Sequence, residues 1–132
     1  MSFQCSIVSP ETELYSGEAE MVVLPAHDDG QIGFLTNHCP YIGGLGCGRL
    51  RVREAGGTEH EWVVYRGFVE FSGNRLTVLA SQSEKPEDVT EDVVRKDREE
   101  IPGLPSKTLA EYDEKQRRMS MLKARTLVLG SR

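Results

Sequence analysis

Histidine, cysteine and aspartate side chains that could bind a metal ion are scattered through the first half of the chain. Zinc ribbons and fingers need ligand pairs two to four residues apart, and no two of the histidines and cysteines here have that spacing. The pair Asp28-Asp29 before Gly30 is more typical of a solvated turn. We therefore expect no metal site from these candidates, which are His27, Asp28, Asp29, His38, Cys39, Cys47 and His60.

Other residues could serve a cofactor or a covalent reaction, but their spacing does not fit either. No Gly-Lys pair occurs, so the chain has no P-loop for a triphosphate. The run Gly44-x-Gly46-x-Gly48 leads into an expected strand, whereas a dinucleotide site needs a helix there; we predict a tight irregular turn between strands. No serine or cysteine sits in a nucleophile elbow. The sequence thus predicts a protein that is not an enzyme and holds no cofactor.

Composition narrows the class further. The 132 residues suffice for one modest core, and the net charge of -5 argues against a nucleic-acid binder, which needs a basic face. The chain lacks a run of about 18 apolar residues, and its first residues resemble neither a signal nor a transit peptide. We expect a cytosolic bacterial protein. Three cysteines without a Cys-x-x-Cys pair predict reduced, mostly buried thiols: Cys5, Cys39 and Cys47.

Residues 3 to 83 have the pattern of short strands separated by turns. Phe3, Cys5 and Ile7 alternate with polar residues, and Ala19, Met21 and Val23 alternate with glutamates. Hairpin turns are expected at Gly56-Gly57 and Gly73-Asn74. Because no long helix separates these strands, the pattern predicts antiparallel pairing in a β-sandwich or flattened barrel.

Beyond residues 83 to 86 the alternation of apolar and polar residues stops, and charged residues dominate. Asp88 with Glu91 predicts a capped helix over 88–100, which the proline-rich segment 101–105 must end. A second helix is expected from Ser106 or Thr108, the latter with Glu111 three residues on, to Leu129, where Gly130 is a plausible stop. The C-terminal region is therefore predicted to be a two-helix hairpin.

The two predicted helices carry opposite charge. Residues 87–105 hold seven acids against three bases, a net of -4, and residues 106–132 hold seven bases against three acids, a net of +4. The hairpin can neutralise itself or be attracted to an acidic partner. An apolar stripe at helical spacing, interrupted by Gln116, requires a partner surface and consists of Leu109, Tyr112, Met119, Leu122 and Leu129.

Four ordered blocks carry a family resemblance over most of residues 1 to 83. They are Gly30–Pro40 (GQIGFLTNHCP), Ser9–Gly17 (SPETELYSG), Gly48–Val52 (GRLRV), and Gly67–Phe71 (GFVEF) followed by Leu76–Ala80 (LTVLA). With these blocks the chain resembles the epsilon subunit of F-type (F1Fo) ATP synthases. The resemblance implies an N-terminal antiparallel β-sandwich of about ten strands, residues 1–84, that docks on other subunits. It also implies that residues 87–132 form a regulatory C-terminal helical hairpin.

The resemblance implies a noncatalytic rotor subunit of the central stalk. Such a subunit couples the gamma subunit to the c-subunit ring, supports proton-driven ATP synthesis, and can inhibit ATP hydrolysis through its hairpin. Its partners would be gamma, the c-ring, and the β and α subunits of the F1 head when the hairpin is extended. It would lie at the cytoplasmic face of the bacterial inner membrane, peripheral and membrane-associated only through the complex.

Site residues follow from the same resemblance. Gly30, Gln31, His38 and Pro40 would contact the c-ring or gamma, although Gln31 stands where an acidic residue is common. The His38 imidazole could instead bond the backbone and fix the turn before Pro40. The basic residues of the second helix would contact the catalytic head: Lys115, Arg117, Arg118, Lys123 and Arg125.

Some bacterial members bind ATP through an Ile-Asp-x-x-Arg-Ala motif at the first helix. The equivalent segment, Val89–Val94, is degenerate at Thr90, which stands in place of the acid, and at Asp92, and it contains no arginine. We therefore expect weak or no ATP binding. The first helix also has few apolar residues to bury, so we expect the folded-back state of the hairpin to be less firmly held.

The alternative from another class is a stand-alone β-sandwich that binds a small ligand or glycan and dimerises through its helical tail. A lectin-like sandwich usually exposes clustered aromatic side chains, whereas the one tryptophan here, Trp62, belongs to an apparently buried strand. Copurification with the α3β3γ assembly separates this alternative from a rotor subunit.

Overall fold

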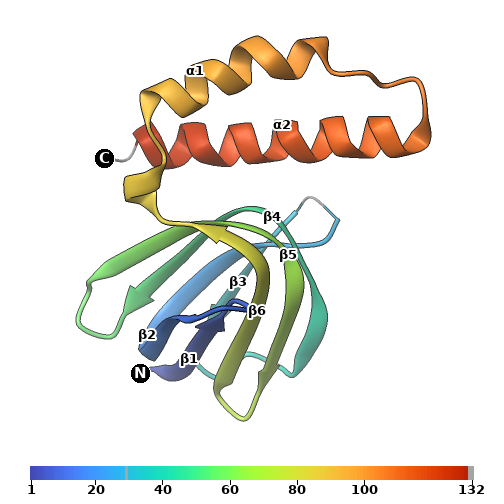
Figure 1. Ribbon diagram of the computed structural model, residues 1–132. Coiled ribbons are helices and arrows are strands. Elements are labelled where there is room, and N and C mark those ends of the chain that lie inside the picture. The colour runs from blue at the N-terminus through green and yellow to red at the C-terminus, as the bar shows by residue number, and fades with distance from the viewer. Residues whose placement is uncertain (29, 131–132) are drawn as a thin grey trace.

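The computed structural model describes residues 1–28 and 30–130, which form a rolled β-sheet with two helices against one side (Figure 1). The strand order in the sheet is β1-β6-β5-β4-β2-β3. An additional pairing between β1 and β2 closes a ring, which contains every strand except β3. The predicted sandwich or flattened barrel with a helical tail is thus confirmed. The strands are β1 (Phe3–Val8), β2 (Glu13–Pro25), β3 (Gln31–Leu35), β4 (Tyr41–Glu54), β5 (Glu59–Ser72) and β6 (Arg75–Glu84).

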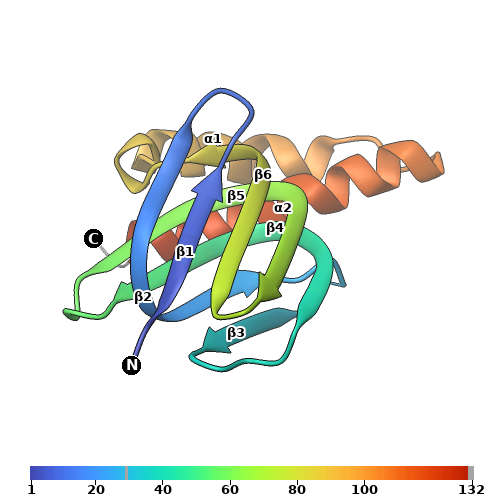
Figure 2. The ribbon, with the colours of Figure 1, turned by 90° about the horizontal axis from the view of Figure 1, so that it is seen from below.

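Pairing is antiparallel except between β1 and β6, which run parallel with Cys5 opposite Leu76. The purely antiparallel prediction is wrong for this pair, because β1 closes the ring between β2 and β6. β3 pairs with β2 along one side and lies outside the ring, as the view from below shows (Figure 2). β3 is therefore an edge strand, a place where backbone groups are open to a partner.

The described residues contain six strands where about ten were expected, because β2, β4 and β5 each continue through a corner of the barrel. In β5 the corner lies at Arg66, whose φ is 52°, and Gly67, whose φ is 149°. A Cβ atom at Gly67 would lie 1.8 Å from the carbonyl oxygen of Leu79. Only glycine allows β5 to bend that closely over β6.

The β2 corner changes which side chains point inward. The sequence predicts Ala19, Met21 and Val23 on the buried face, but the structure buries Ala19, Val22 and Leu24. The pairing with β4 shifts by one residue between Ala19 and Met21. Because strand side chains alternate with period two, this one-residue bulge moves the following residues to the opposite face.

The glycine run lies inside β4 and is not the predicted turn between strands. The end of β2 crosses over it, with Ala26 forming an isolated bridge to Leu45. A Cβ atom at Gly46 would lie 2.1 Å from the Ala26 carbonyl oxygen. The glycines are needed for this backbone crossing, a purpose that the local sequence does not reveal.

Aromatic rings form the centre of the sandwich core. Phe34 and Phe71 stack with ring centroids 5.5 Å apart, and Phe3 meets Phe71 edge-on at 5.5 Å. The predicted inward alternation of β1 is confirmed, since Phe3, Cys5 and Ile7 are all buried. Leucine and valine side chains from every neighbouring strand complete this core, including Val22, Leu24, Leu45, Leu50, Val52, Val64, Val69, Leu76 and Val78.

The three cysteines occupy different environments. Burial raises the pKa of the Cys5 thiol to about 12, and Cys47 is half-buried. Cys39 is exposed, so the expectation of mostly buried thiols is wrong for this residue. It lies in the segment that connects β3 to β4, outside the sandwich core.

The C-terminal region consists of the 3-10 turn η1 (Pro86–Asp88), α1 (Glu91–Glu100), the 3-10 turn η2 (Ile101–Gly103) and α2 (Leu109–Gly130). The predicted cap at Asp88 is wrong. Asp88 ends η1 and Val89 is extended and buried, so the cap is Thr90, whose Oγ1 accepts from the Val93 N–H at 3.3 Å.

The predicted capping box of the second helix is confirmed. The Thr108 Oγ1 accepts from the Glu111 N–H at 3.1 Å, and the Thr108 N–H donates to the Glu111 carboxylate at 3.3 Å. The alternative start at Ser106 is not used. The reciprocal bonds explain why α2 begins at Leu109.

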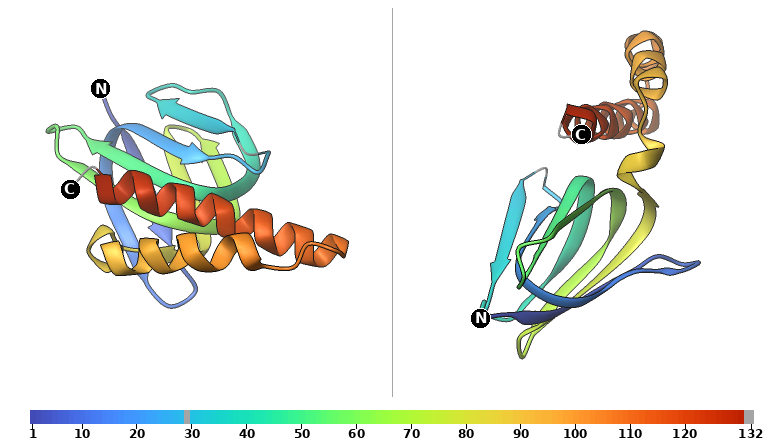
Figure 3. Two further views of the ribbon diagram at one scale, coloured as in Figure 1. Left: turned by 90° about the horizontal axis from the view of Figure 1, so that it is seen from above. Right: turned by 90° about the vertical axis from the view of Figure 1, so that its left-hand side faces the viewer.

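α2 lies between α1 and the sandwich, and the hairpin forms a layer of its own (Figures 1 and 3). Its apolar contact with the sandwich is a small cluster of Val63, Val89, Val94, Ala124 and Val128. α2 therefore buries a face centred on Ala124 and Val128.

The apolar stripe expected to face a partner surface is mostly left outside. Leu109 is 77% exposed, Tyr112 50% and Met119 46%, whereas Leu122 and Leu129 pack partly against the cluster. The packed face of α2 is therefore centred on Ala124 and Val128 and includes only two residues of the predicted stripe.

Candidate partner-binding surfaces

The predicted contact residues of the β3 region fall at the two ends of that strand. Gly30 and Gln31 precede or begin β3, and His38 and Pro40 follow its other end. With about 3.3 Å per residue, an extended strand of this length keeps the two pairs well apart. The four residues therefore form two separate sites, and the role of each as a contact remains a prediction.

The first site faces the hairpin. The Gly30 N–H donates to the Asp28 carboxylate at 3.2 Å, and the Gly30 carbonyl accepts from the Ala26 N–H at 2.8 Å. These bonds form a tight turn that leaves Gln31 exposed at the start of β3. Gly30 and Gln31 line a hollow of about 270 Å³ beneath α2, together with Lys123.

The second site is centred on His38. Its Nδ1 lies 2.7 Å from the Cys39 carbonyl oxygen, and its ring packs against Phe34 at 4.7 Å and Phe71 at 5.5 Å between centroids. The structural role expected for this imidazole, fixing the turn before Pro40, is confirmed. The same contacts join the turn to the sandwich core.

A pair of asparagines, not recognised from the sequence as a unit, locks the same turn. The Asn37 N–H donates to the Asn74 side-chain oxygen at 2.7 Å, and the Asn74 amide donates back to the Asn37 side-chain oxygen at 3.0 Å. Both residues have positive φ, 68° and 54°. Asparagine tolerates this conformation, so Asn-containing turns in both segments were the available signal.

An exposed apolar patch covers the outer side of the sheet. Phe68 is opposite Gly44 on β4 and Leu79 on β6, so these positions share one face, and Ile42 follows on the same face. Ile42 is 69% exposed, Leu79 48% and Phe68 45%. Phe68 and Leu79 line an open hollow of about 330 Å³ with Val8 and Pro10. Exposed apolar side chains grouped in this way are typical of a docking surface.

The basic residues of α2 mostly pair within the chain. Arg117 pairs with Glu114 and lies over the Tyr65 ring at 4.6 Å, and Lys115 donates to the Pro102 carbonyl at 3.4 Å. Arg118 and Arg125 pair with acids of β6 and α1, while Lys123 is exposed. The sequence left two possibilities for these charges, pairing within the hairpin or attraction to an acidic partner. In this structure most of them pair within the chain.

Arg125 occupies the centre of this pairing. Its Nε and Nη2 donate to the Glu84 carboxylate at 2.8 and 3.0 Å, and its Nη1 donates to Asp97. Burial alone would lower the pKa of Arg125, but its hydrogen bonds to Glu84 and Asp97 outweigh this effect and hold the pKa above its ordinary value. Arg125 is therefore a permanent cation held by two carboxylates.

The segment equivalent to the ATP-binding motif takes part in helix capping and in a surface ion pair. Thr90 caps α1, and Asp92 pairs with Arg95 on the exposed surface at 3.1 Å. Within residues 1–28 and 30–130, no three His, Cys, Asp or Glu side chains gather where they could hold a metal ion. No helix in this part of the chain is long and apolar enough to cross a membrane.

Comparison with known proteins assigns the sandwich. Residues 2–86 match the family model described as ATP synthase, Delta/Epsilon chain, beta-sandwich domain. The chain belongs to this family. Its members are noncatalytic subunits of the ATP synthase complex, which agrees with the prediction that the chain is not an enzyme. The ligand-binding alternative finds no support in the core, where Trp62 is only 7% exposed.

Individual relatives are epsilon chains from bacteria and chloroplasts. An epsilon chain of Brevibacillus brevis is 34% identical over 107 residues, covering 81% of this chain and 80% of that one. A chloroplast epsilon chain of Tetradesmus obliquus is 39% identical over 92 residues, covering 67% of this chain. The match spans 64% of the length of that chloroplast chain, somewhat less than two thirds.

Solved structures show that the hairpin belongs to the same fold. A chain of the Euglena gracilis mitochondrial ATP synthase, in a structure of OSCP, F1 and c-ring, matches with a TM-score of 0.85 over 97% of this chain and 81% of that chain. A chain of the Tetrahymena thermophila mitochondrial central stalk and c-ring matches at 0.70 over 94% and 93%. Both are 15% identical, so the likeness concerns the fold.

Proposed function

We propose that this chain is an epsilon-type, noncatalytic subunit of an ATP synthase central stalk that couples gamma to the c-ring during proton-driven ATP synthesis. The observation that carries the proposal is the match of sandwich and hairpin together, over 97% of the chain, to a chain in an F1 and c-ring assembly. The subunit is peripheral and reaches the membrane only through the complex. A bacterial inner membrane is the proposed site, although the relatives include chloroplast chains.

The gamma subunit is the proposed partner of the apolar patch. Ile42, Phe68 and Leu79 supply exposed apolar area on the sheet. Pro40 and His38 lie two and four residues before Ile42 in the chain. Burial of such side chains is a main source of binding free energy between proteins. Phe68→Glu should therefore abolish copurification with α3β3γ.

Leu35→Glu is a matched control for that experiment. Leu35 is 58% exposed on β3 and lies outside the apolar patch, so the same charge introduced there should leave gamma binding intact. Equal loss in both variants would show that the patch is not the specific gamma contact. Copurification of both at the level of the unmodified chain would exclude this face.

The c-ring is the proposed partner of the start of β3, where Gly30 and Gln31 lie. This end is polar and exposed, which fits the polar loops of a membrane ring better than an apolar shaft. A Gln31→Cys variant in the assembled complex should form cross-links to a c subunit, and Pro40→Cys should form them to gamma. The reverse pattern would exchange the two assignments.

The hairpin is the proposed inhibitor of ATP hydrolysis. Arg125 pairs with Glu84 of β6 in the folded-back chain, and release of α2 from the sandwich would free this charge to contact acidic loops of the β and α subunits. The assembled complex with a chain ended after Pro86 should hydrolyse ATP faster than the complex with the full chain. Equal rates would remove the inhibitory role and leave the structural one.

A further inference from the structure

We propose that Arg125 is a two-way latch in which Glu84 and Asp97 hold different parts of the hairpin and can be released separately. Glu84 is the last residue of β6, so its bidentate pair with Arg125 attaches α2 to the sandwich. Asp97 lies on α1, so its pair with Arg125 attaches α1 to α2. One guanidinium on the middle layer thus connects three elements.

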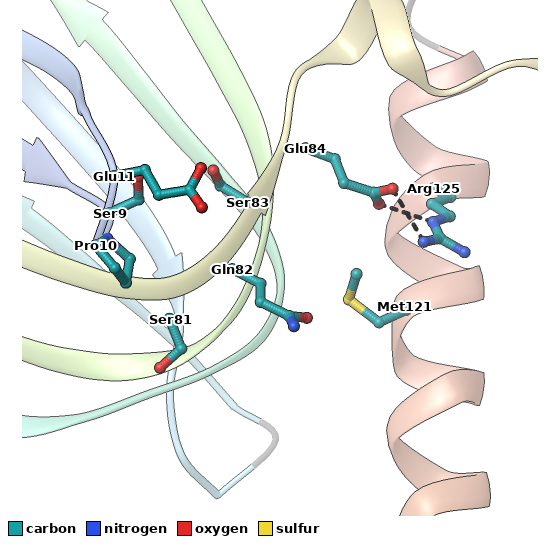
Figure 4. Close-up of a pocket in the computed structure, with 9 residues that line it drawn as sticks. All are labelled: Ser9, Pro10, Glu11, Ser81, Gln82, Ser83, Glu84, Met121 and Arg125. Carbon is teal, nitrogen blue, oxygen red and sulfur yellow. Dashed lines mark hydrogen bonds and ion pairs between the residues drawn. The ribbon is translucent and has the colours of Figure 1, made fainter.

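The Glu84 contact replaces close packing on its side of the molecule. Beside it a hollow of about 380 Å³ opens between the β1–β2 turn, β6 and α2. Figure 4 shows the Glu84–Arg125 pair bridging this gap, with Met121 as the other labelled side chain from α2. The small valine and alanine cluster is the neighbouring apolar contact. The Glu84–Arg125 pair therefore joins α2 to β6 at the edge of this hollow.

The Asp97 contact is drier and doubly paired. The Asp97 side chain is only 8% exposed, and Arg118 approaches its second oxygen at 3.5 Å while also approaching Glu100 at 3.6 Å. A buried carboxylate with two arginine partners is costly to separate, because each group would be left as an unpaired charge in a poorly hydrated site. α1 and α2 should consequently remain together when the Glu84 contact opens.

The difference in exposure predicts the order of release. The Glu84 side chain is 28% exposed and borders the hollow, so salt and competing carboxylates reach its pair with Arg125 first. Breaking that pair lifts the hairpin as a unit and presents Arg125 to an outside acid. Only this last step rests on the proposed function, where the acid belongs to the catalytic head.

The native cysteines provide a test on the isolated full-length chain. The Cys47 Sγ lies 3.8 Å from the Arg117 carbonyl oxygen beneath α2, and Cys5 is fully buried in the sandwich core. In a Cys39→Ser background, the alkylation rate of Cys47 reports lifting of α2, and that of Cys5 reports unfolding of the sandwich. Glu84→Gln should speed Cys47 alkylation about tenfold, the effect of a 1.4 kcal/mol change, and leave Cys5 unchanged.

Two further variants make the test specific. Glu59→Gln removes an equivalent carboxylate from the Arg53 pair within the sheet and should leave the Cys47 rate unchanged. Asp97→Asn should speed hydrogen exchange of the α1 amides while the Cys47 rate stays within about twofold, a change below 0.5 kcal/mol. An unchanged Cys47 rate in Glu84→Gln, or a rise shared by Cys5, overturns the latch. An equal Cys47 rise in Asp97→Asn overturns separate release.

The ATP hydrolysis assay separates the latch from the proposed function. If Glu84→Gln lifts the hairpin in the isolated chain, the assembled complex with this variant should hydrolyse ATP more slowly than the complex with the unmodified chain. Faster Cys47 alkylation without slower hydrolysis would refute the inhibitory role and support the latch. An unchanged Cys47 rate would refute the latch whatever the complex does.

Discussion

The sandwich and the hairpin are stabilised by different physical means. The sandwich core contains the Phe71 ring in contact with Phe3 and Phe34, together with many leucines and valines. The hairpin is attached to it by a cluster of five small buried apolar residues and by the Arg125–Glu84 pair. Apolar burial cannot be exchanged for another partner without exposing surface to water, whereas an ion pair can change partners. The contrast predicts a fixed docking unit and a releasable regulatory unit.

The largest effect should come from the sandwich core. Phe71→Ala removes a ring that contacts Phe3, Phe34 and His38, and should lower the free energy of unfolding by about 3–5 kcal/mol. Denaturant unfolding followed by circular dichroism measures this loss. Phe68→Ala, on the same strand but exposed, should change it by about 0.5 kcal/mol or less. Equal effects would contradict a core centred on Phe71.

Alkaline pH should destabilise the sandwich through Cys5. Burial raises the pKa of this thiol from 9.0 to about 12, so the folded chain keeps the proton that the unfolded chain loses. The contribution is complete well below pH 9 and is lost as the pH rises toward 12, by about 1.6 kcal/mol between pH 9 and 10.5. Unfolding midpoints at several pH values test this.

Cys5→Ala is the control for the pH experiment and should flatten the pH dependence in this range. Part of the slope should remain, because burial and the hydrogen bond to Glu54 raise the pKa of Tyr15 to about 12 as well. Arg125 keeps its charge throughout, since its pKa lies above its ordinary value. An unchanged slope in Cys5→Ala would contradict the burial argument.

A smaller and local effect is expected in the hairpin cluster. Val128→Ala removes two methyl groups from the contact between α2 and the sandwich, a loss of about 1.5 kcal/mol. Hydrogen exchange of α2 amides should become faster, whereas the unfolding midpoint of the sandwich should stay the same. Leu127→Ala, on the exposed side of α2, is the matched control. A shift of the sandwich midpoint would show that the two regions unfold as one unit.

The smallest effect should arise at the start of α2. Thr108→Ala removes one of the two reciprocal cap bonds and should destabilise the helix by about 1 kcal/mol. Faster hydrogen exchange should be confined to the first turn of α2. Ser106→Ala provides the comparison, because Ser106 precedes the helix and does not cap it. Equal exchange in the two variants would show that the cap contributes little.

Local patterns were sufficient for much of the fold. The alternation of Phe3, Cys5 and Ile7 and the Thr108–Glu111 box each express interactions between near neighbours, so the sequence reveals them directly. The β2 bulge, the Arg66 corner and the Gly46 crossing depend on strands that meet only after folding. The residues at these places give no local signal. The sequence therefore predicted the wrong buried side chains in β2, and it predicted a turn at the glycine run, which lies inside β4.

The candidate sites also combine features that the local sequence reveals with features that depend on contacts between distant residues. The blocks around Gly30 and His38 were visible as a signature, but their placement at opposite ends of β3 requires the sheet register. The charge difference between the helices was visible as well. The convergence of Glu84, Asp97 and Arg125 was not, because these residues are 13 and 28 positions apart along the chain and no local rule pairs them.

The Asn37–Asn74 bonds have a mechanical consequence. They attach the loop that carries His38 to the β5–β6 turn by two hydrogen bonds, at the end of the barrel opposite the helices (Figure 1). A sideways force on this loop is therefore shared at once by two long strands, β5 and β6, whose ladder continues through the body of the domain. The loop should therefore resist shear better than a loop attached only at its two ends.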